Sequence, residues 1–82
     1  MSDVRLVVFA RARETAGRAT DEFAAATVAD LLDQARGRYG PEFAAVLATA
    51  RVWVNGDEPA AGLLTVLAPG DEVAVLPPVS GG

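Results

Sequence analysis

One amphipathic helix in the middle of the chain constrains its fold more than any other feature. Thr27 is a good N-cap residue, and Asp30 follows three positions later as a shortened capping box. The apolar residues of the segment recur at helical spacing on one stripe: Val28, Leu31, Leu32, Ala35 and Tyr39. Gly40-Pro41 ends the helix, because proline cannot continue the hydrogen-bond ladder. A helix with one apolar stripe needs a second layer to cover that stripe.

Strand-like runs on both sides of the helix supply this layer. They predict strands over Val4–Ala10, Ala19–Ala24, Arg51–Asn55 and Glu72–Leu76, with a further short edge strand within Glu58–Leu64. Both faces of the first run are partly apolar, so we expect it to lie at the centre of the sheet. We interpret the helix-compatible stretch Arg11–Gly17 as a loop that joins the first two strands into a hairpin. Phe43, Val46 and Leu47 predict one or two further helical turns.

The element order predicts an α+β fold, in which one main helix packs on a mixed sheet of four to five strands. The β-grasp fold satisfies this order, although periodicity alone does not fix the order of the strands. A chain of 82 residues has room for one domain. We expect the domain to span residues 1–76 and a flexible tail that ends in Gly-Gly to span residues 77–82.

The inventory of reactive side chains limits the chemistry. The chain has no histidine, cysteine or lysine, and so lacks the commonest general base, the thiol nucleophile and the Schiff-base amine. It also lacks the best nitrogen and sulfur metal ligands. The pairs Asp57-Glu58 and Asp71-Glu72 follow turn residues without calcium-loop spacing, and we interpret them as solvated turn charges. We expect no activity of the chain alone, no metal or cofactor bound by it, and chemistry at a chain terminus.

Charge and hydropathy exclude two classes of partner. The net charge is −4, and the seven basic residues are all arginines, scattered rather than clustered, which argues against nucleic acid. No apolar run approaches the roughly 18 residues of a membrane helix. The absence of cysteine fits a reducing compartment, so we expect a cytoplasmic protein. An acidic domain is suited to meet a basic surface of a partner protein.

The chain ends in Pro77-Pro78-Val79-Ser80-Gly81-Gly82. The two prolines cannot donate ladder hydrogen bonds, so the sheet ends there and the tail projects from it. A thread without bulky side chains at its tip fits a narrow tunnel and places the carboxyl of Gly82 where an enzyme can activate it. The alternative is a frayed terminus without function.

Several stretches resemble the small subunit of molybdopterin synthase, and together they cover nearly the whole chain. They are the ending Gly70–Gly82, the segment Phe9–Gly17, the helix start Thr27–Leu32, and Val54-Asn55-Gly56. The resemblance implies a ubiquitin-like β-grasp sulfur carrier for molybdenum cofactor biosynthesis. An E1-like adenylyltransferase would adenylate its terminal glycine with ATP and Mg²⁺, and a sulfurtransferase would supply the sulfur of a thiocarboxylate. The carrier would then donate this sulfur to cyclic pyranopterin monophosphate, as part of a heterotetramer with the large synthase subunit.

The resemblance also assigns residues. It implies that Gly82 carries the reacting carboxyl, and that the large subunit's tunnel receives the segment before it: Pro77, Pro78, Val79, Ser80 and Gly81. Leu76 and Phe9 would form an apolar docking surface, and Arg13 would contact a partner. Core packing for Phe9 and a solvated charge for Arg13 remain open. For Trp53 and Tyr39 we expect packing in the core or an interface rather than ligand stacking.

Two other functions stay open. A sulfur carrier for thiamine or cysteine synthesis would share the Gly-Gly ending and the E1-like activation. A protein-modifying ubiquitin-like tag would be distinguished by isopeptide conjugates on other proteins. The two prolines before the tail and the Arg11–Glu14 segment favour the pterin pathway.

Overall fold

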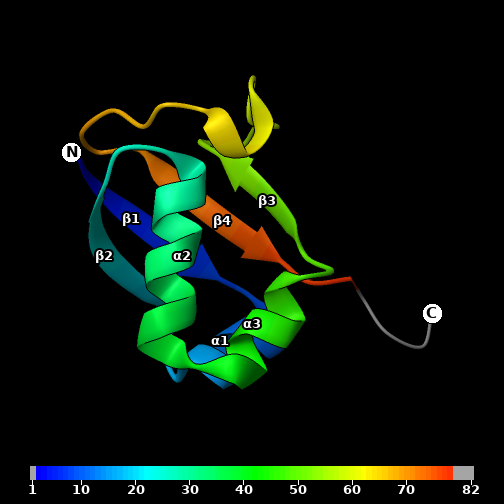
Figure 1. Ribbon diagram of the computed structural model, residues 1–82. Helices are drawn as coiled ribbons and strands as arrows, with labels where there is room; N and C mark the ends of the chain where they lie inside the picture. Colours follow the sequence, from blue (N-terminus) through cyan, green and yellow to red (C-terminus); the bar gives the residue numbers. More distant parts are fainter. Residues whose placement is uncertain (1, 79–82) are drawn as a thin grey trace.

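The computed structural model describes residues 2–78 and alternates short strands with helices. In chain order the elements are β1 (Ser2–Val8), α1 (Ala10–Ala16), β2 (Thr20–Ala25), α2 (Val28–Tyr39), α3 (Pro41–Leu47), β3 (Arg51–Val54), the 3₁₀ helix η1 (Gly62–Leu64) and β4 (Glu72–Leu76) (Figure 1). Pro77 and Pro78 follow β4 outside any strand.

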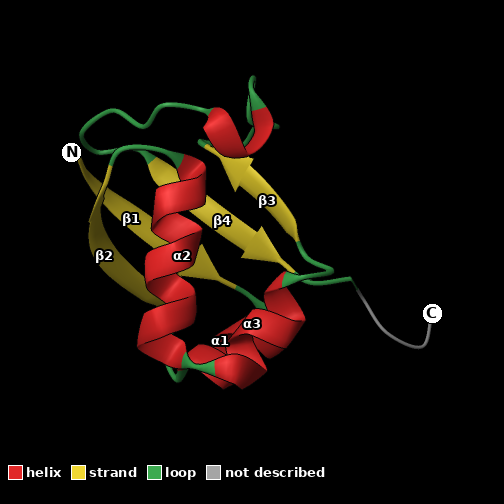
Figure 2. Cartoon of the chain, in the orientation of Figure 1, coloured by secondary structure: helices red, strands yellow, loops and turns green. Residues whose placement is uncertain are grey.

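The four strands form one mixed sheet in the order β2-β1-β4-β3. β1 pairs with β4 in parallel, whereas the pairs β1/β2 and β3/β4 are antiparallel. α2 crosses one face of this sheet, and α3 follows it on the same side (Figure 2). This is the β-grasp arrangement, so the predicted α+β fold and the central place of the first strand are confirmed.

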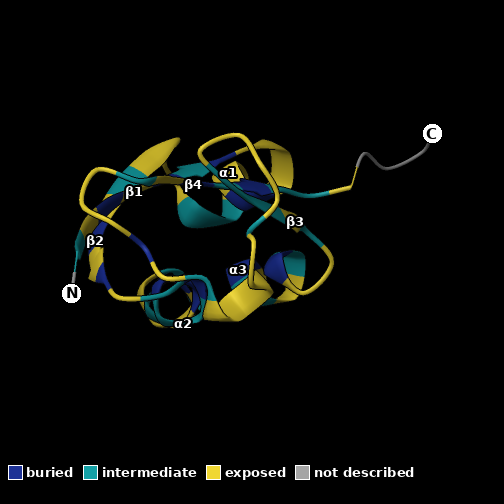
Figure 3. Ribbon diagram, turned by 90° about the horizontal axis from the view of Figure 1, so that it is seen from above, coloured by how far each residue is buried: buried dark blue, intermediate teal, exposed yellow. Residues whose placement is uncertain are grey.

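The core lies between the sheet and the helices (Figure 3). Alternate residues of β1 and β4 point into it, because successive side chains of a strand face opposite sides of a sheet. From β1 these are Val4, Leu6 and Val8, and from β4 they are Val73 and Val75. The helices contribute Val28, Leu31, Leu32 and Ala35 from α2 and Phe43 and Leu47 from α3. The predicted helical stripe is therefore the buried one.

The N-terminus of α2 is capped as the sequence predicts. The hydroxyl of Thr27 accepts the N–H of Asp30 at 3.1 Å, and the Asp30 carboxylate accepts the N–H of Ala26, also at 3.1 Å. These bonds satisfy donors that have no partner within the helix. α3 begins at Pro41, which confirms the further turns expected around Phe43.

Two sequence-based expectations are wrong. The stretch expected as a loop is the helix α1, with Gly17 as a left-handed C-cap at φ 77°. Ala12 is its one buried side chain, so the sequence shows no repeating apolar stripe there. The edge strand expected within Glu58–Leu64 does not form: a single bridge joins Asp57 to Val54, and η1 follows. Pro59 accounts for this, because it cannot donate to a ladder.

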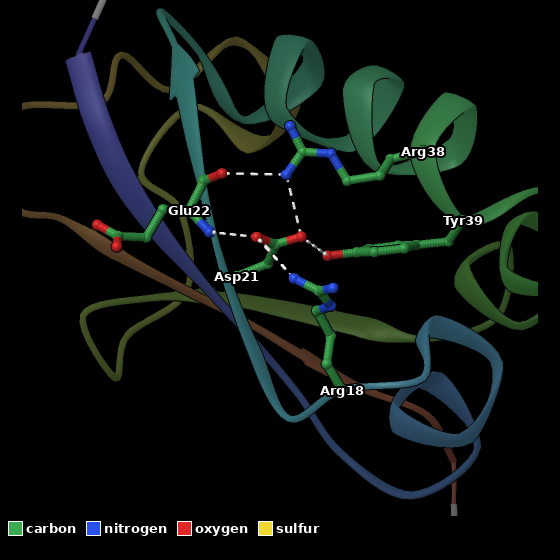
Figure 4. A network of polar contacts seen from close by, with 5 residues as sticks. All are labelled: Arg18, Asp21, Glu22, Arg38 and Tyr39. Carbon is green, nitrogen blue, oxygen red and sulfur yellow. Dashed lines mark hydrogen bonds and ion pairs between the residues drawn. The ribbon is translucent and has the colours of Figure 1, made fainter.

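A polar cluster around Asp21 ties the end of α2 to β2 (Figure 4). The Asp21 carboxylate accepts the hydroxyl of Tyr39 at 2.5 Å and a guanidinium N–H of Arg38 at 3.0 Å, and it forms an ion pair with Arg18 at 3.4 Å. The Tyr39 ring packs edge-on against Phe23, with the ring centres 6.2 Å apart. Tyr39 therefore has a packing role, as expected.

Two opposing effects set the pKa of Asp21. Burial raises it, but the hydrogen bonds from Tyr39 and Arg38 outweigh burial and hold the pKa of Asp21 at about 2. Burial, together with the hydrogen bond to the Asp21 carboxylate, raises the pKa of the Tyr39 hydroxyl. At neutral pH the Asp21 carboxyl is therefore ionised, and the Tyr39 hydroxyl keeps its proton and donates it to the hydrogen bond.

Across residues 2–78, every helix is too short or too polar to span a bilayer.

Candidate functional site

The sheet face opposite α2 changes from charged to apolar toward the end where the tail begins. One row across three strands is charged: Glu22, Arg5 and Glu72. The next row toward the tail is apolar: Val7, Ala74 and Trp53. Phe9 and Leu76 lie beyond it, where β1 and β4 end. The apolar end of this face therefore adjoins Pro77 and Pro78, which follow β4 and which we call the tail root.

Phe9 projects at the junction between β1 and α1. Its N–H donates to the C=O of Val75 at 3.2 Å, which fixes its backbone beside β4. The next residue, Ala10, has φ 50°, a conformation that costs a non-glycine residue energy and turns the chain sharply into α1. The Phe9 side chain keeps 45% of its surface exposed, so it is not a core residue. Of the two roles considered for Phe9, the structure favours the surface one.

Phe9, Leu76 and Trp53 line one shallow apolar hollow. The hollow has a volume of about 300 Å³ and is completed by Gly56 and Ala74. Trp53 lies directly opposite Ala74 in the β3/β4 ladder, and both Trp53 and Leu76 are half-buried. The expected pairing of Leu76 with Phe9 is thus present. The alternation in Arg51-Val52-Trp53-Val54 could have placed Trp53 here, because Val52 and Val54 pack against the core and Trp53 must face the other side.

A second concavity lies at the root of the tail itself. Pro77 and Pro78 form one wall of a groove of about 410 Å³, and α1 and α3 form the other. Arg11 and Thr15 line it from α1, and Val46 lines it from α3. Sequence reasoning singled out Arg13 on α1 but not Arg11, which the structure places beside the prolines. Arg13 is exposed on the same helix and does not line the groove.

The charge around the tail root differs from the charge of the whole chain. Within residues 2–78, the ion pairs occupy Arg18, Arg36 and Arg38. Arg11 and Arg13 on α1 and Arg51 opposite Leu76 are exposed and have no carboxylate within 4.0 Å in that part of the chain. Arg11 therefore lines the groove beside the prolines together with Glu42, and Arg51 lies opposite Leu76, so charges of both signs are present there although the net charge is −4.

One member of the acidic turn pairs, Asp71, has a local role. Asp71 accepts the N–H of Ala68 at 2.8 Å and the side-chain amide of Asn55 at 3.0 Å, and these bonds lower the pKa of Asp71. They tie the turn at Asn55 to the turn before β4. Among residues 2–78, no three acidic side chains gather in a way that could hold a metal ion.

The remaining predicted site residues, Val79 to Gly82, lie outside the described residues. Their roles stay predictions. The structure describes the apolar hollow and the prolines that precede them.

Comparison with known proteins decides the family. The model of the ThiS family matches residues 6–82. The chain belongs to the ThiS family. ThiS-family proteins share the ubiquitin-like β-grasp fold of sulfur carriers and protein modifiers, so the coarse part of the expected function is confirmed. No curated protein of known function matches the sequence.

Solved structures similar to this ThiS-family chain come from both groups. The small archaeal modifier protein 1 (SAMP1) of Methanosarcina acetivorans is 30% identical with a TM-score of 0.89, over 100% of this chain and 98% of that one. SAMP1 of Haloferax volcanii is 35% identical with a TM-score of 0.84, over 99% and 100%. A putative molybdopterin converting factor, subunit 1, of Pyrococcus furiosus is 29% identical with a TM-score of 0.83, over 96% and 100%.

Proposed function

We propose that the chain is the sulfur carrier of molybdenum cofactor biosynthesis and the small subunit of a molybdopterin synthase. An E1-like enzyme adenylates the carboxyl of Gly82 with ATP and Mg²⁺, which gives a poor electrophile a good leaving group. Sulfur at the oxidation level of sulfide, supplied by a sulfurtransferase, then displaces AMP from the carbonyl carbon, and the product is a thiocarboxylate. Inside the large subunit this thiocarboxylate donates its sulfur to cyclic pyranopterin monophosphate. Two carriers and two large subunits form the heterotetramer.

The apolar hollow at the tail root is the observation that carries this proposal. A carrier of this kind must dock by its body and thread its tail, because the chain has no side-chain nucleophile of its own. The hollow lined by Phe9, Trp53 and Leu76 offers the aromatic contact area that dominates protein interfaces. It adjoins the segment that would enter the partner.

Pro77 and Pro78 suit the threading step. Each proline fixes φ near −65°, so the segment has less conformational freedom to lose when it enters a tunnel. Arg11 beside the prolines and Arg51 opposite Leu76 offer partners for carboxylates at the tunnel mouth of a partner. The likeness to the Pyrococcus furiosus converting factor supports the choice of the pterin pathway.

Reconstitution tests the proposal. The thiocarboxylated protein is mixed with a molybdopterin synthase large subunit and cyclic pyranopterin monophosphate, and in parallel with thiazole synthase and its substrates. We expect molybdopterin in the first mixture and no thiazole in the second, because partner choice is a difference of affinities. Thiazole without molybdopterin would overturn the pathway and leave the role of Gly82 intact.

A second function is supported by the likeness to SAMP1 from two archaea, at 30% and 35% identity. In that case the same activated carboxyl forms isopeptide bonds with lysines of other proteins. The chain has no lysine and so cannot build chains on its own side chains. Mass spectrometry of native lysates for lysines of other proteins that carry the segment 52–82 of this chain, the remnant that trypsin leaves after Arg51, separates the tag from the carrier.

A further inference from the structure

The two edges of the sheet end in different ways. At the β2 edge, the C=O of Ala24 accepts the side-chain amide of Gln34 at 2.8 Å, and the C=O of Glu22 accepts Arg38 at 3.1 Å. The N–H of Glu22 donates to the Asp21 carboxylate at 2.8 Å. Side chains therefore occupy both backbone groups of Glu22 and the C=O of Ala24 at this edge, which is a common protection against unwanted strand pairing.

The β3 edge is occupied only at its far end. Val54 exchanges backbone hydrogen bonds with Asp57, at 2.7 and 3.0 Å, around a turn in which Asn55 and Gly56 both have positive φ. The next pair of this hairpin would join Val52 to Pro59. Because proline has no N–H, the ladder stops, and in the part of the chain that the structure describes no loop backbone group bonds to Val52.

The ladder pattern shows where the backbone groups of Val52 point. The N–H of Asn55 donates to the C=O of Glu72 at 2.8 Å, so Asn55 is a hydrogen-bonded position of the β3/β4 pair. Hydrogen-bonded positions alternate along an antiparallel pair, which makes Trp53 another one and Val52 a position that faces away from β4. The N–H and C=O of Val52 thus point out of the sheet.

A groove lies where these groups point. It has a volume of about 280 Å³, and its walls are Arg51, Val52 and Trp53 on one side and Glu58, Pro59 and Gly62 on the other. Pro59 turns the chain away from β3 and so leaves this space beside the edge. A donor, an acceptor and an open groove in one place are what an added strand requires.

We propose that an extended segment of a partner protein pairs with Val52 in this groove and becomes a fifth strand of the sheet. The residue opposite Val52 exchanges two backbone hydrogen bonds with it. Its two neighbours lie on the face of Arg51 and Trp53. Arg51 has no carboxylate partner within residues 2–78, and Trp53 is half-buried, so the segment carries an acidic residue and, two positions away, an apolar one.

This surface goes beyond the proposed function and does not depend on it. Arg51 lies opposite Leu76 in the ladder, so the groove is continuous with the tail root. A partner that receives the tail can supply the segment as well. If no segment paired with the β3 edge, the roles proposed for the apolar hollow and the tail would be unaffected.

Peptide titration followed by nuclear magnetic resonance tests the inference. The full-length protein, isotope-labelled on nitrogen, is titrated with N-acetylated, C-amidated Thr-Glu-Thr-Val-Thr and with a control peptide that has Lys in place of Glu. We expect a saturable downfield shift and slower solvent exchange at the amide of Val52 with the first peptide. The control binds more weakly, and Arg51→Glu reverses the preference between the two peptides.

Backbone variants supply the second arm. Val52→Pro removes the outward N–H without removing a bond to β4 and weakens binding by roughly tenfold, whereas Val52→Thr keeps the N–H and the affinity. If Val52→Pro loses the dispersed spectrum of a folded protein, the test rests on whether Arg51→Glu reverses the preference between the two peptides. The proposal would be overturned if Val52→Pro and Val52→Thr bound the peptide equally well, or if Arg51→Glu left the peptide preference unchanged. It would also be overturned if the chemical-shift changes were confined to the hollow around Phe9. So would protection of the Val52 amide without peptide together with concentration-dependent sedimentation, because a second copy would then hold the edge.

Discussion

Leucines in three places of this small domain have three different roles. Leu31 is fully buried beneath the sheet, Leu64 keeps 78% of its surface exposed on η1, and Leu76 lies half-buried in the hollow at the tail root. The chemistry of the side chain is the same in each case. Its surroundings decide whether the residue stabilises the fold, contributes little, or offers a surface to a partner.

The core role of Leu31 predicts a large loss of stability on truncation. Leu31→Ala should lower the free energy of unfolding by roughly 2 to 5 kcal/mol, because it removes buried methyl groups and leaves a cavity. Leu64→Ala removes the same atoms from an exposed position and should change the free energy of unfolding by less than about 0.5 kcal/mol. Urea denaturation of both variants checks this, and equal midpoints would show that Leu31 is not a core residue.

The docking role that we propose for Leu76 predicts a loss of binding without unfolding. Leu76→Glu places a charge where contact with a partner would remove water, so the affinity for the large synthase subunit and for the activating enzyme should fall by at least about tenfold. Ala24→Glu adds the same charge to the outer face of β2, far from the hollow along the sheet, and serves as the control. Calorimetric titration measures both affinities. Unchanged binding by Leu76→Glu would place Leu76 outside the interfaces.

Sequence reasoning succeeded for elements with a repeating pattern. The α2 stripe and its cap, the strand alternation and the Asn55-Gly56 turn each depend on neighbouring residues, and the structure confirms them. α1 was missed because its single buried side chain, Ala12, makes no pattern. In the candidate site, Phe9 and Leu76 were predicted together, but Arg11 beside the prolines was not. Its position depends on how α1 packs against α3, which no local pattern encodes.

The link between β2 and α2 predicts how stability depends on pH. The pKa of Asp21 is about 2 in the folded protein and 3.8 for the unperturbed carboxyl, so the folded state favours the ionised form. Its contribution is complete above the unfolded pKa and is lost as the pH falls from about 4 to 2. We expect a loss on the order of 1 to 2 kcal/mol over this window.

Asp21→Asn is the control for this titration, because it keeps the size of the side chain and removes its charge. Denaturation midpoints of the wild-type protein and Asp21→Asn, measured at pH 6, 4 and about 2.5, should converge as the pH falls. A constant difference between them would show that Asp21 does not stabilise the fold through its charge.

At the scale of the whole molecule, the body and the tail have separate tasks. The body is a β-grasp domain whose last strand ends at Leu76, and Pro77 and Pro78 carry the chain out of the sheet beside α1 and α3. Within residues 2–78, every buried residue belongs to the body. We therefore expect a change at the end of the tail to alter the proposed reacting group and to leave the core of the body intact.

This separation predicts that altering Gly82 abolishes function and spares the fold. Deleting Gly82, or adding one residue after it, moves or blocks the carboxyl that must reach the activating enzyme, so no thiocarboxylate should form and no sulfur should be transferred. The melting temperature should stay within experimental error. Intact-mass spectrometry detects the thiocarboxylate, and calorimetry follows the melting. Sulfur transfer by either variant would contradict the carrier role.

The parallel pairing of β1 with β4 has a consequence for folding during synthesis on the ribosome. These strands form the centre of the sheet, yet one comes at the start of the described chain and the other at its end. Contacts between such distant segments form late, because a long loop must close first. A nascent or truncated chain that lacks β4 therefore has neither a sheet centre nor the Leu76 side of the hollow. We expect such incomplete chains to lack the hollow as a binding surface and to be cut by proteases faster than the complete domain.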